Sequence, residues 1–432
     1  MKTRKFNALF ALIFALALCL SSFTTAFAAL DENGALLGTE AVPAQAAITK
    51  ILQMPKGTDT PNANFVFEVK AVSAADCADP AEAPAITDIT ISFDQNMAGE
   101  TRGATKSVPK ESLDIFAGKN FPHAGVYAYE ITEKQKTNTA IDANTKHEDL
   151  KYSPAKYTLK VYVQNKADGS GTYIYAIGDV ITNPDNECQK AGDKVDPTPG
   201  DNGNGDYSKM IFTNTYVKTN GPTDPDDPDP TKDEDSILSV SKMVEGGFAS
   251  KELYFNFNLT VTKPALVSGD QTYRAYVVEG NKVLKATEMA ANKVTAAGTD
   301  DKGQDYIEVS DALTFSLKHG QKLVFIDTPV GTSYEVTEIN PTDYKPHYTI
   351  TTNGTPAAEV AGSLSASLAT GTQWAGEATN KAAYRNERDD ITPTGLNLND
   401  LPFIGMIALA FGAVAAVAVA KARKVRKMAS FH

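Results

Sequence analysis

The amino-acid sequence predicts an all-β protein with two tandem immunoglobulin-like β-sandwich domains. Short alternating runs rich in Val, Ile, Tyr, Phe and Thr fill most of the chain, and Gly, Pro and Asn separate them. A Pro- and Asp-rich segment without apolar residues, 219–235, divides these runs and cannot bury a core. Similar short motifs recur on both sides of it, so we expect related domains at 45–218 and 236–390.

The two halves repeat three motifs in the same order. Each half has a strand-like run with a Lys, then one with a Glu, then one with an Asn. The corresponding pairs are ITKILQMPKG (48–57) with VSKMVEGG (240–247), YEITE (129–133) with YEVTE (334–338), and IFTNTY (211–216) with AAYRNE (382–387).

The polar residues of these motifs fall on the faces that should point into the cores. Side chains of a strand alternate between its two faces, so Lys50 shares a face with Ile48 and Leu52. The same alternation applies to the other motifs. The residues expected to face inward are Lys50, Glu133 and Asn214 in the first domain and Lys242, Glu338 and Asn386 in the second.

A buried Lys, Glu and Asn can react with one another. Burial lowers the pKa of a Lys and raises that of a Glu, so both groups can be neutral together. The neutral amine is a nucleophile, and the protonated Glu can polarise the Asn carbonyl and carry the proton that lets ammonia leave. The product is a Lys–Asn isopeptide bond, formed without a cofactor. In the second domain Asn380 has the same strand parity as Asn386 and is an alternative partner for Lys242.

The first 28 residues are typical of a cleaved secretory signal peptide. A basic start with Lys2, Arg4 and Lys5 precedes an apolar run at 8–20. The small-x-small sequence at 26–28 then offers a cleavage site, so the mature chain should begin near Ala29.

The C-terminal part, 391–427, resembles a cell-wall sorting signal. Residues 401–420 are apolar and long enough to span a bilayer as a helix, and a basic tail follows them. Just upstream stands the motif Ile391, Thr392, Pro393, Thr394 and Gly395. This order predicts that a membrane-bound sortase cuts between Thr394 and Gly395. The LPFIG run at 401–405 lies inside the apolar stretch, and we reject it as the sorting motif.

Charge and composition exclude several function classes. The whole chain has a net charge of −12. The terminal signals hold eight basic residues and one acidic residue, which leaves 33 basic and 52 acidic residues, a net charge of −19, at 29–394. Such a surface repels nucleic acid. The five His residues are scattered without metal-ligand spacing, so we expect neither a metal site nor an enzyme. Cys77 and Cys188 could form a disulfide outside the cell or remain as thiols.

Taken together, the Lys, Glu and Asn order, the YEITE and FTNT motifs and the Pro-Thr-Gly signal resemble the streptococcal T-antigen-type backbone pilins, with their pilin isopeptide-linkage domains. The resemblance covers nearly all of the mature chain. It implies autocatalytic bonds Lys50–Asn214, promoted by Glu133, and Lys242–Asn386, promoted by Glu338.

The resemblance also implies a function and partners. The chain would be the repeating subunit of a pilus on a Gram-positive cell, covalently attached to the cell wall. Its partners would be a pilus-class sortase, other copies of itself, peptidoglycan or an anchoring pilin, and a host adhesion target. The alternative is a minor pilin or a stand-alone wall-anchored adhesin.

Polymerisation also needs an amine on the neighbouring subunit. In the related pilins this is a lysine just before the final strand of the N-terminal domain, which here corresponds to Lys209 in YSKMIFTN. Its strand parity is opposite to that of Asn214, so we expect it to point outward. The usual YPK-type motif is absent, and Lys194 or Lys218 could serve instead.

Overall fold

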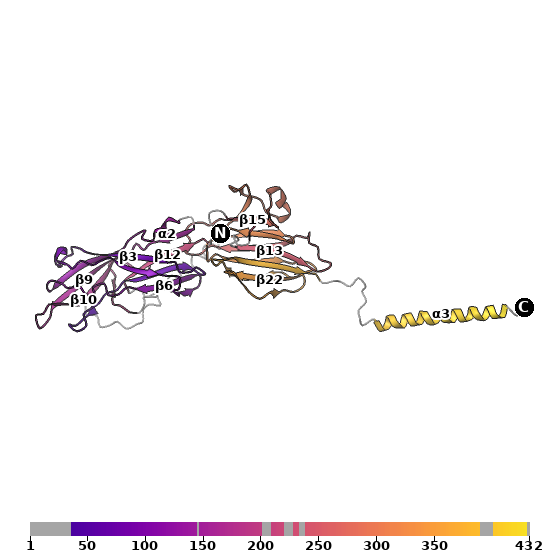
Figure 1. Ribbon diagram of the computed structural model, residues 1–432, viewed down its shortest axis with the longest axis horizontal. Coiled ribbons are helices and arrows are strands. Elements are labelled where there is room, and N and C mark those ends of the chain that lie inside the picture. The colour runs from indigo at the N-terminus through magenta and orange to yellow at the C-terminus, as the bar shows by residue number, and fades with distance from the viewer. Residues whose placement is uncertain are drawn as a thin grey trace.

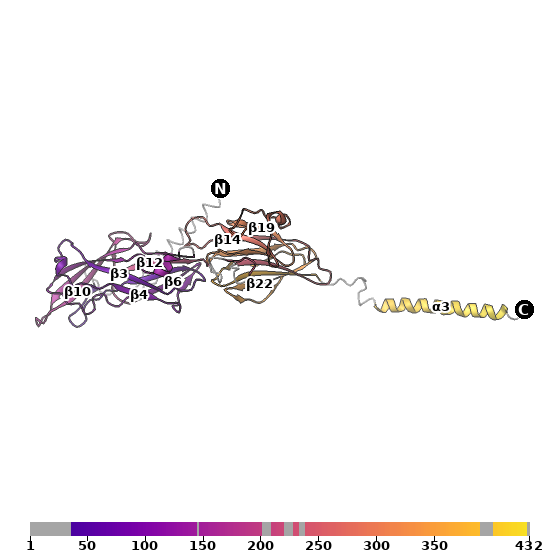
Figure 2. The ribbon, with the colours of Figure 1, turned by 45° about the horizontal axis from the view of Figure 1, so that its top comes forward.

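The all-β prediction is confirmed. The structure, a computed structural model, shows two β-sandwich domains lying end to end along the long axis of the molecule (Figure 1), an arrangement also seen in the rotated view (Figure 2). The predicted signal peptide, the motif at 391–395 and most of the predicted linker at 219–235 lie outside the described residues. The structure describes residues 36–144, 147–200, 209–219, 228–232, 238–388 and 401–429.

The N-terminal domain is built from two facing sheets. They are joined by loops that include a short helix, α2 (Thr139–Ala143), and a 3-10 turn, η1 (Pro80–Glu82). The first sheet runs, in spatial order, β1 (Leu36–Leu37), β10 (Thr172–Asn183), β9 (Lys156–Asn165), β7 (Gly125–Glu133), β3 (Ala63–Ala71) and β4 (Ile89–Phe93), with β11 (Lys194–Val195) also on β10. The second runs β5 (Glu100–Arg102), β6 (Thr105–Glu111), β2 (Thr49–Pro55), β12 (Ile211–Lys218) and β8 (Glu148–Lys151).

The C-terminal domain also has two facing sheets, but here the larger sheet carries the parallel pair of first and last long strands. A 3-10 segment, η3 (Ala286–Asn292), lies in one of its loops. The first sheet runs β17 (Gly298–Thr299), β18 (Asp305–Val309), β15 (Tyr273–Glu279), β20 (Gln321–Phe325), β13 (Leu238–Glu245), β27 (Asn380–Glu387), β22 (Lys345–Thr352) and β23 (Thr355–Pro356), with β16 (Lys282–Val283) on β15 and β24 (Val360–Ala361) on β22. The second runs β19 (Ala312–Leu317), β14 (Phe255–Thr262), β21 (Ser333–Ile339) and β25 (Leu368–Ala369), with β26 (Gln373–Trp374) also on β21.

Alternating side chains build both cores, as the sequence pattern predicts. Along β3, Phe65, Phe67 and Val69 are buried while Asn64 and Glu68 are exposed. Strand β14 alternates in the same way. This period of two is the reason that the strands carry one apolar face toward the opposite sheet and one polar face toward solvent.

The two domains touch through a small polar joint. The carboxylate of Glu377 accepts hydrogen bonds at 2.8 Å from the Lys218 amine and at 2.8 Å from the backbone N–H of Asp59. Nearby, the Lys56 amine lies 5.0 Å from the centre of the Trp374 ring. Because these contacts join side chains of both domains at the end of β12, they help to align the sandwiches.

The C-terminal segment forms one long helix, α3 (Leu401–Ala429). Its stretch Ile404–Arg423 has a mean hydropathy of 2.1, is unburied in this structure, and is long and apolar enough to cross a membrane. This agrees with the span predicted at 401–420.

Candidate functional site

The first and last long strands of the N-terminal domain place Lys50 beside Asn214. Strands β2 and β12 are parallel neighbours, with Phe212 opposite Lys50 and Asn214 opposite Leu52. Both polar side chains point into the core, and both are fully buried. This adjacency explains how residues 164 positions apart can lie within reach of each other.

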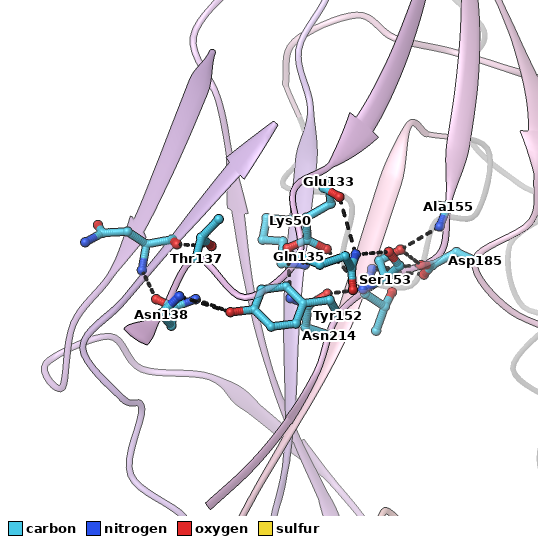
Figure 3. A network of polar contacts seen from close by, with 12 residues as sticks. Lys50, Glu133, Gln135, Thr137, Asn138, Tyr152, Ser153, Ala155, Asp185 and Asn214 are labelled. Atoms are coloured by element: carbon cyan, nitrogen blue, oxygen red, sulfur yellow. Dashed lines mark hydrogen bonds and ion pairs between the residues drawn. The ribbon is translucent and has the colours of Figure 1, made fainter. Parts of the chain in front are cut away.

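Glu133 approaches the pair from the opposite sheet, at the end of β7 (Figure 3). The Lys50 Nζ lies 2.9 Å from Glu133 Oε1 and 3.0 Å from Oε2. The Asn214 Nδ2 donates to Glu133 Oε1 at 2.8 Å. Around the amine the core is aromatic, with the Phe65 ring centre 4.6 Å from Lys50 Nζ. The carboxyl group therefore contacts both the amine and the amide nitrogen in the buried core.

The C-terminal domain contains the same arrangement. Lys242 on β13 and Asn386 on β27 again lie on parallel neighbouring strands, and Glu338 reaches them from β21 in the other sheet. The Lys242 Nζ donates to Glu338 Oε1 at 2.5 Å, and Asn386 Nδ2 donates to the same oxygen at 2.8 Å. Phe255 covers the amine at 4.4 Å, as Phe65 does in the first domain.

Burial moves both lysines toward the neutral form. Desolvation lowers the pKa of Lys50 to about 8, although the nearby Glu133 opposes the change. Lys242 shows the same lowering, to about 8, for the same reason, with Glu338 as the opposing charge. Desolvation raises the pKa of both Glu133 and Glu338. Burial therefore shifts both partners of each pair toward their neutral forms, and the neutral amine is the form that can attack an amide.

Asn386, rather than Asn380, belongs to this cluster. Asn380 is buried at the start of β27, opposite Leu238, four residues before Lys242 on β13. Its Oδ1 accepts hydrogen bonds from the backbone N–H groups of Asn353 and Gly376. The side chain of Asn380 thus anchors the loop before β27.

The structure differs from the sequence interpretation in how the asparagine carbonyl is bound. We expected the glutamic acid to donate to that carbonyl. In the N-terminal domain Glu133 instead contacts the amide nitrogen, and Asn214 Oδ1 accepts a hydrogen bond at 2.6 Å from the backbone N–H of Ser153. Sequence reasoning missed Ser153. A repeated Tyr-x-Pro, at 152–154 and 344–346, was the available signal.

Comparison with known proteins identifies this type of domain. Residues 46–217 match the family described as "Spy0128-like isopeptide containing domain". Residues 236–388 match a "Domain of unknown function (DUF7601)". A curated protein named "Pilin", from Streptococcus pyogenes serotype M1, is 24% identical over 299 residues, which are 69% of this chain and 68% of that protein.

The N-terminal domain belongs to this isopeptide-containing domain family, and the chain is similar to a pilin. This confirms the family predicted from the motifs. Among solved structures, the major pilin from Streptococcus pyogenes superposes with a TM-score of 0.32 at 17% identity, over 81% of this chain and 99% of that one. A pilus-presented adhesin, Spy0125 (Cpa), superposes with a TM-score of 0.23 at 15% identity, over 55% of this chain and 36% of that one.

The amine of Lys209 is less accessible than strand parity predicts. It lies 3.2 Å from Asp196 Oδ2 and donates at 3.0 Å to the carbonyl oxygen of Thr198, and the side chain is only 12% exposed. The reason is that the segment at 196–198 lies beside Lys209 in a parallel bridge and covers its amine. Lys194 on β11 is exposed.

The Cys77–Cys188 disulfide is not formed, because Cys77 is a free cysteine. The backbone N–H of Ala78, next to Cys77, donates to the carbonyl of Val126 near the start of β7, and Val126 pairs with Tyr162 on β9. Cys188 follows the end of β10, which pairs with Lys156 at the other end of β9. At about 3.3 Å per residue these levels are roughly 20 Å apart, whereas a disulfide needs Cα atoms within about 7 Å.

Proposed function

We propose that this chain is the structural subunit of a covalently polymerised pilus, assembled and wall-anchored by a pilus-class sortase. The observation that supports this most is the pair of buried Lys–Glu–Asn clusters, one in each domain, built on the same strands with the same contacts. Family membership and the apolar helix α3 agree with a protein of the cell surface.

Each cluster would form one isopeptide bond, Lys50–Asn214 or Lys242–Asn386. The neutral amine attacks the amide carbon of the asparagine, and a C–N bond forms. The adjacent glutamic acid receives the proton from the amine and delivers it to the amide nitrogen, which leaves as ammonia. No cofactor or oxidant is consumed. The reaction happens once in each domain, so the protein is a self-modifying substrate rather than an enzyme with turnover.

Assembly would use the segment after the C-terminal domain. The sortase would cleave between Thr394 and Gly395 while α3 holds the chain in the membrane. The resulting acyl group would pass to an amine of the next subunit, and at the base of the fibre to peptidoglycan or an anchoring pilin. Co-expression with a pilus-class sortase should therefore give a ladder of SDS-resistant species. A single wall-bound species would support the minor pilin or stand-alone adhesin instead.

Lys209 is the proposed acceptor amine, and replacing it should abolish the ladder. Lys209→Arg keeps the positive charge that pairs with Asp196 but removes the usable primary amine. Immunoblots of wall extracts should show monomer at the surface and no high-mass species, while the matched variant Lys194→Arg keeps the ladder. If Lys209→Arg still polymerises and Lys194→Arg does not, the acceptor is Lys194.

A further inference from the structure

The backbone N–H of Ser153 lies at the reacting atoms of the N-terminal cluster. It is buried, and it donates to Asn214 Oδ1 at 2.6 Å and to Glu133 Oε2 at 3.0 Å (Figure 3). Strand β8 pairs with β12 only as far as Lys151 opposite Thr215. The chain then leaves the ladder, so the N–H of Ser153 can turn toward the Asn214 side chain.

Asp185 fixes the position of this N–H. Its carboxylate accepts hydrogen bonds from the Ser153 hydroxyl and, at 3.1 and 3.0 Å, from the backbone N–H of Thr213 on β12. The Ser153 hydroxyl also accepts a hydrogen bond from the backbone N–H of Ala155 at 3.1 Å. Pro154 further restricts the backbone of Ser153 to extended conformations. Asp185 therefore ties the loop that carries the N–H directly to the strand that carries Asn214.

The described residues of the C-terminal domain, 238–388, place no such donor at Asn386. Tyr344 packs edge-on against Phe255 as Tyr152 packs against Phe65, so Lys345 corresponds to Ser153. Here, however, β22 continues as a ladder strand and places Pro346 opposite Asn386. Proline has no N–H. Accordingly, Asn386 Oδ1 and Glu338 Oε2 are buried without a hydrogen-bond partner among the described residues.

We propose that the backbone N–H of Ser153 is the oxyanion donor for cross-linking in the N-terminal domain, and that Asp185 is its positioning residue. When Lys50 Nζ attacks Asn214 Cγ, the electron pair of the carbonyl π bond moves to Oδ1, which the N–H stabilises. Collapse restores the carbonyl and breaks the Cγ–Nδ2 bond, with the nitrogen protonated through Glu133. The N-terminal domain should therefore cross-link faster than the C-terminal domain. This inference rests on the proposed isopeptide chemistry.

The test compares both domains in the full chain. Cell-free translation is stopped at successive times, and mass spectrometry of the digest scores the Lys50–Asn214 and Lys242–Asn386 linked peptides separately. Asp185→Asn and Ser153→Ala both weaken the hydrogen bond between residues 185 and 153 that positions the N–H, but both keep the N–H itself. Ser153→Ala deletes only a hydroxyl group. Asp149→Asn is the matched control, because Asp149 lies in the same domain with its side chain 59% exposed.

Removal of a single oxyanion donor typically slows a reaction by about 100- to 1,000-fold, so loss of its support should slow cross-linking by about tenfold or more. We expect this in the first domain for Asp185→Asn and Ser153→Ala, with no change in the second domain or in Asp149→Asn. In the wild type the first bond should form before the second. Wild-type bonds that form at equal rates in the two domains would overturn the inference.

The pH profile separates positioning from a simple charge effect. The charged groups facing the Lys50 amine are Glu133 from β7 and Asp185 from the loop after β10, and both raise its pKa. If Asp185 acted only through this charge, Asp185→Asn would lower the pKa of Lys50 and speed the reaction at neutral pH. Slower cross-linking at every pH supports the inference. Unchanged or faster cross-linking overturns it and leaves the proposed function intact, whereas a wild-type chain without either bond refutes both.

Discussion

Glu133→Ala should leave the N-terminal domain without its cross-link and greatly reduce its stability. The bond would close a loop of 164 residues between the first and last long strands. By the chain-entropy model, closing a loop of this length stabilises the folded domain by about 5 kcal/mol. For a domain of this size, that loss corresponds to a fall in Tm of roughly 10–20 °C. Thermal denaturation followed by circular dichroism would measure it.

The sequence offers a matched control for this variant in each domain. Glu130 stands three residues before Glu133 on β7, faces outward and pairs with Lys156. Glu335 holds the same place before Glu338 on β21. Glu130→Ala and Glu335→Ala should stay within about 1 kcal/mol of the wild type, because a surface ion pair such as that of Glu130 contributes little, and surface substitutions usually have small effects. Equal melting of Glu130→Ala and Glu133→Ala would argue against a stabilising cross-link promoted by Glu133.

Replacing Thr394 and Gly395 with alanine should abolish both the polymer ladder and wall attachment. The sortase has to attack the carbonyl of Thr394 to form its acyl intermediate, and these residues lie outside the described structure. Without cleavage the chain keeps α3, whose apolar stretch Ile404–Arg423 should hold it in the membrane fraction. Fractionation into wall, membrane and medium, with immunoblotting, would show this shift.

The rejected LPFIG run supplies the control for the sorting experiment. Gly405 lies in α3 with no atoms near enough to contact an added methyl group, so Gly405→Ala should leave the helix intact. We expect this variant to polymerise like the wild type. If instead Gly405→Ala loses the ladder and the Thr394 and Gly395 variant keeps it, cleavage occurs inside the LPFIG run.

Strand periodicity was sufficient to place the Lys and Glu of both clusters, and Asn214, in the cores. A period of two has only two outcomes, and the apolar neighbours of Lys50, such as Ile48 and Leu52, decide which face is inside. The repeat of the pattern in the second domain made the assignment stronger. Periodicity could not choose between Asn380 and Asn386, since both have the same parity. The strand register decides, because Asn386 lies two residues and Asn380 four residues from the position on β27 that is opposite Lys242.

Other features depend on geometry beyond a strand and could not be predicted this way. The parity argument for Lys209 could not show that the segment at 196–198 lies beside this residue and covers its amine. The direction of the Ser153 N–H depends on the residue at which β8 stops pairing with β12. The pattern of apolar and polar side chains does not reveal that residue. The pairing of Cys77 and Cys188 could not be decided because both lie in loops, and the sequence does not show whether two loops lie at the same end of a sheet.

The intact mass of the recombinant mature chain, residues 29–394, tests the central claim most directly. Two isopeptide bonds predict a mass lower than the sequence mass by two molecules of ammonia, with linked peptides joining Lys50 to Asn214 and Lys242 to Asn386. Glu133→Ala should restore the mass of one ammonia, and Glu338→Ala the other. A wild-type mass equal to the sequence mass, measured on natively folded protein, would contradict the account.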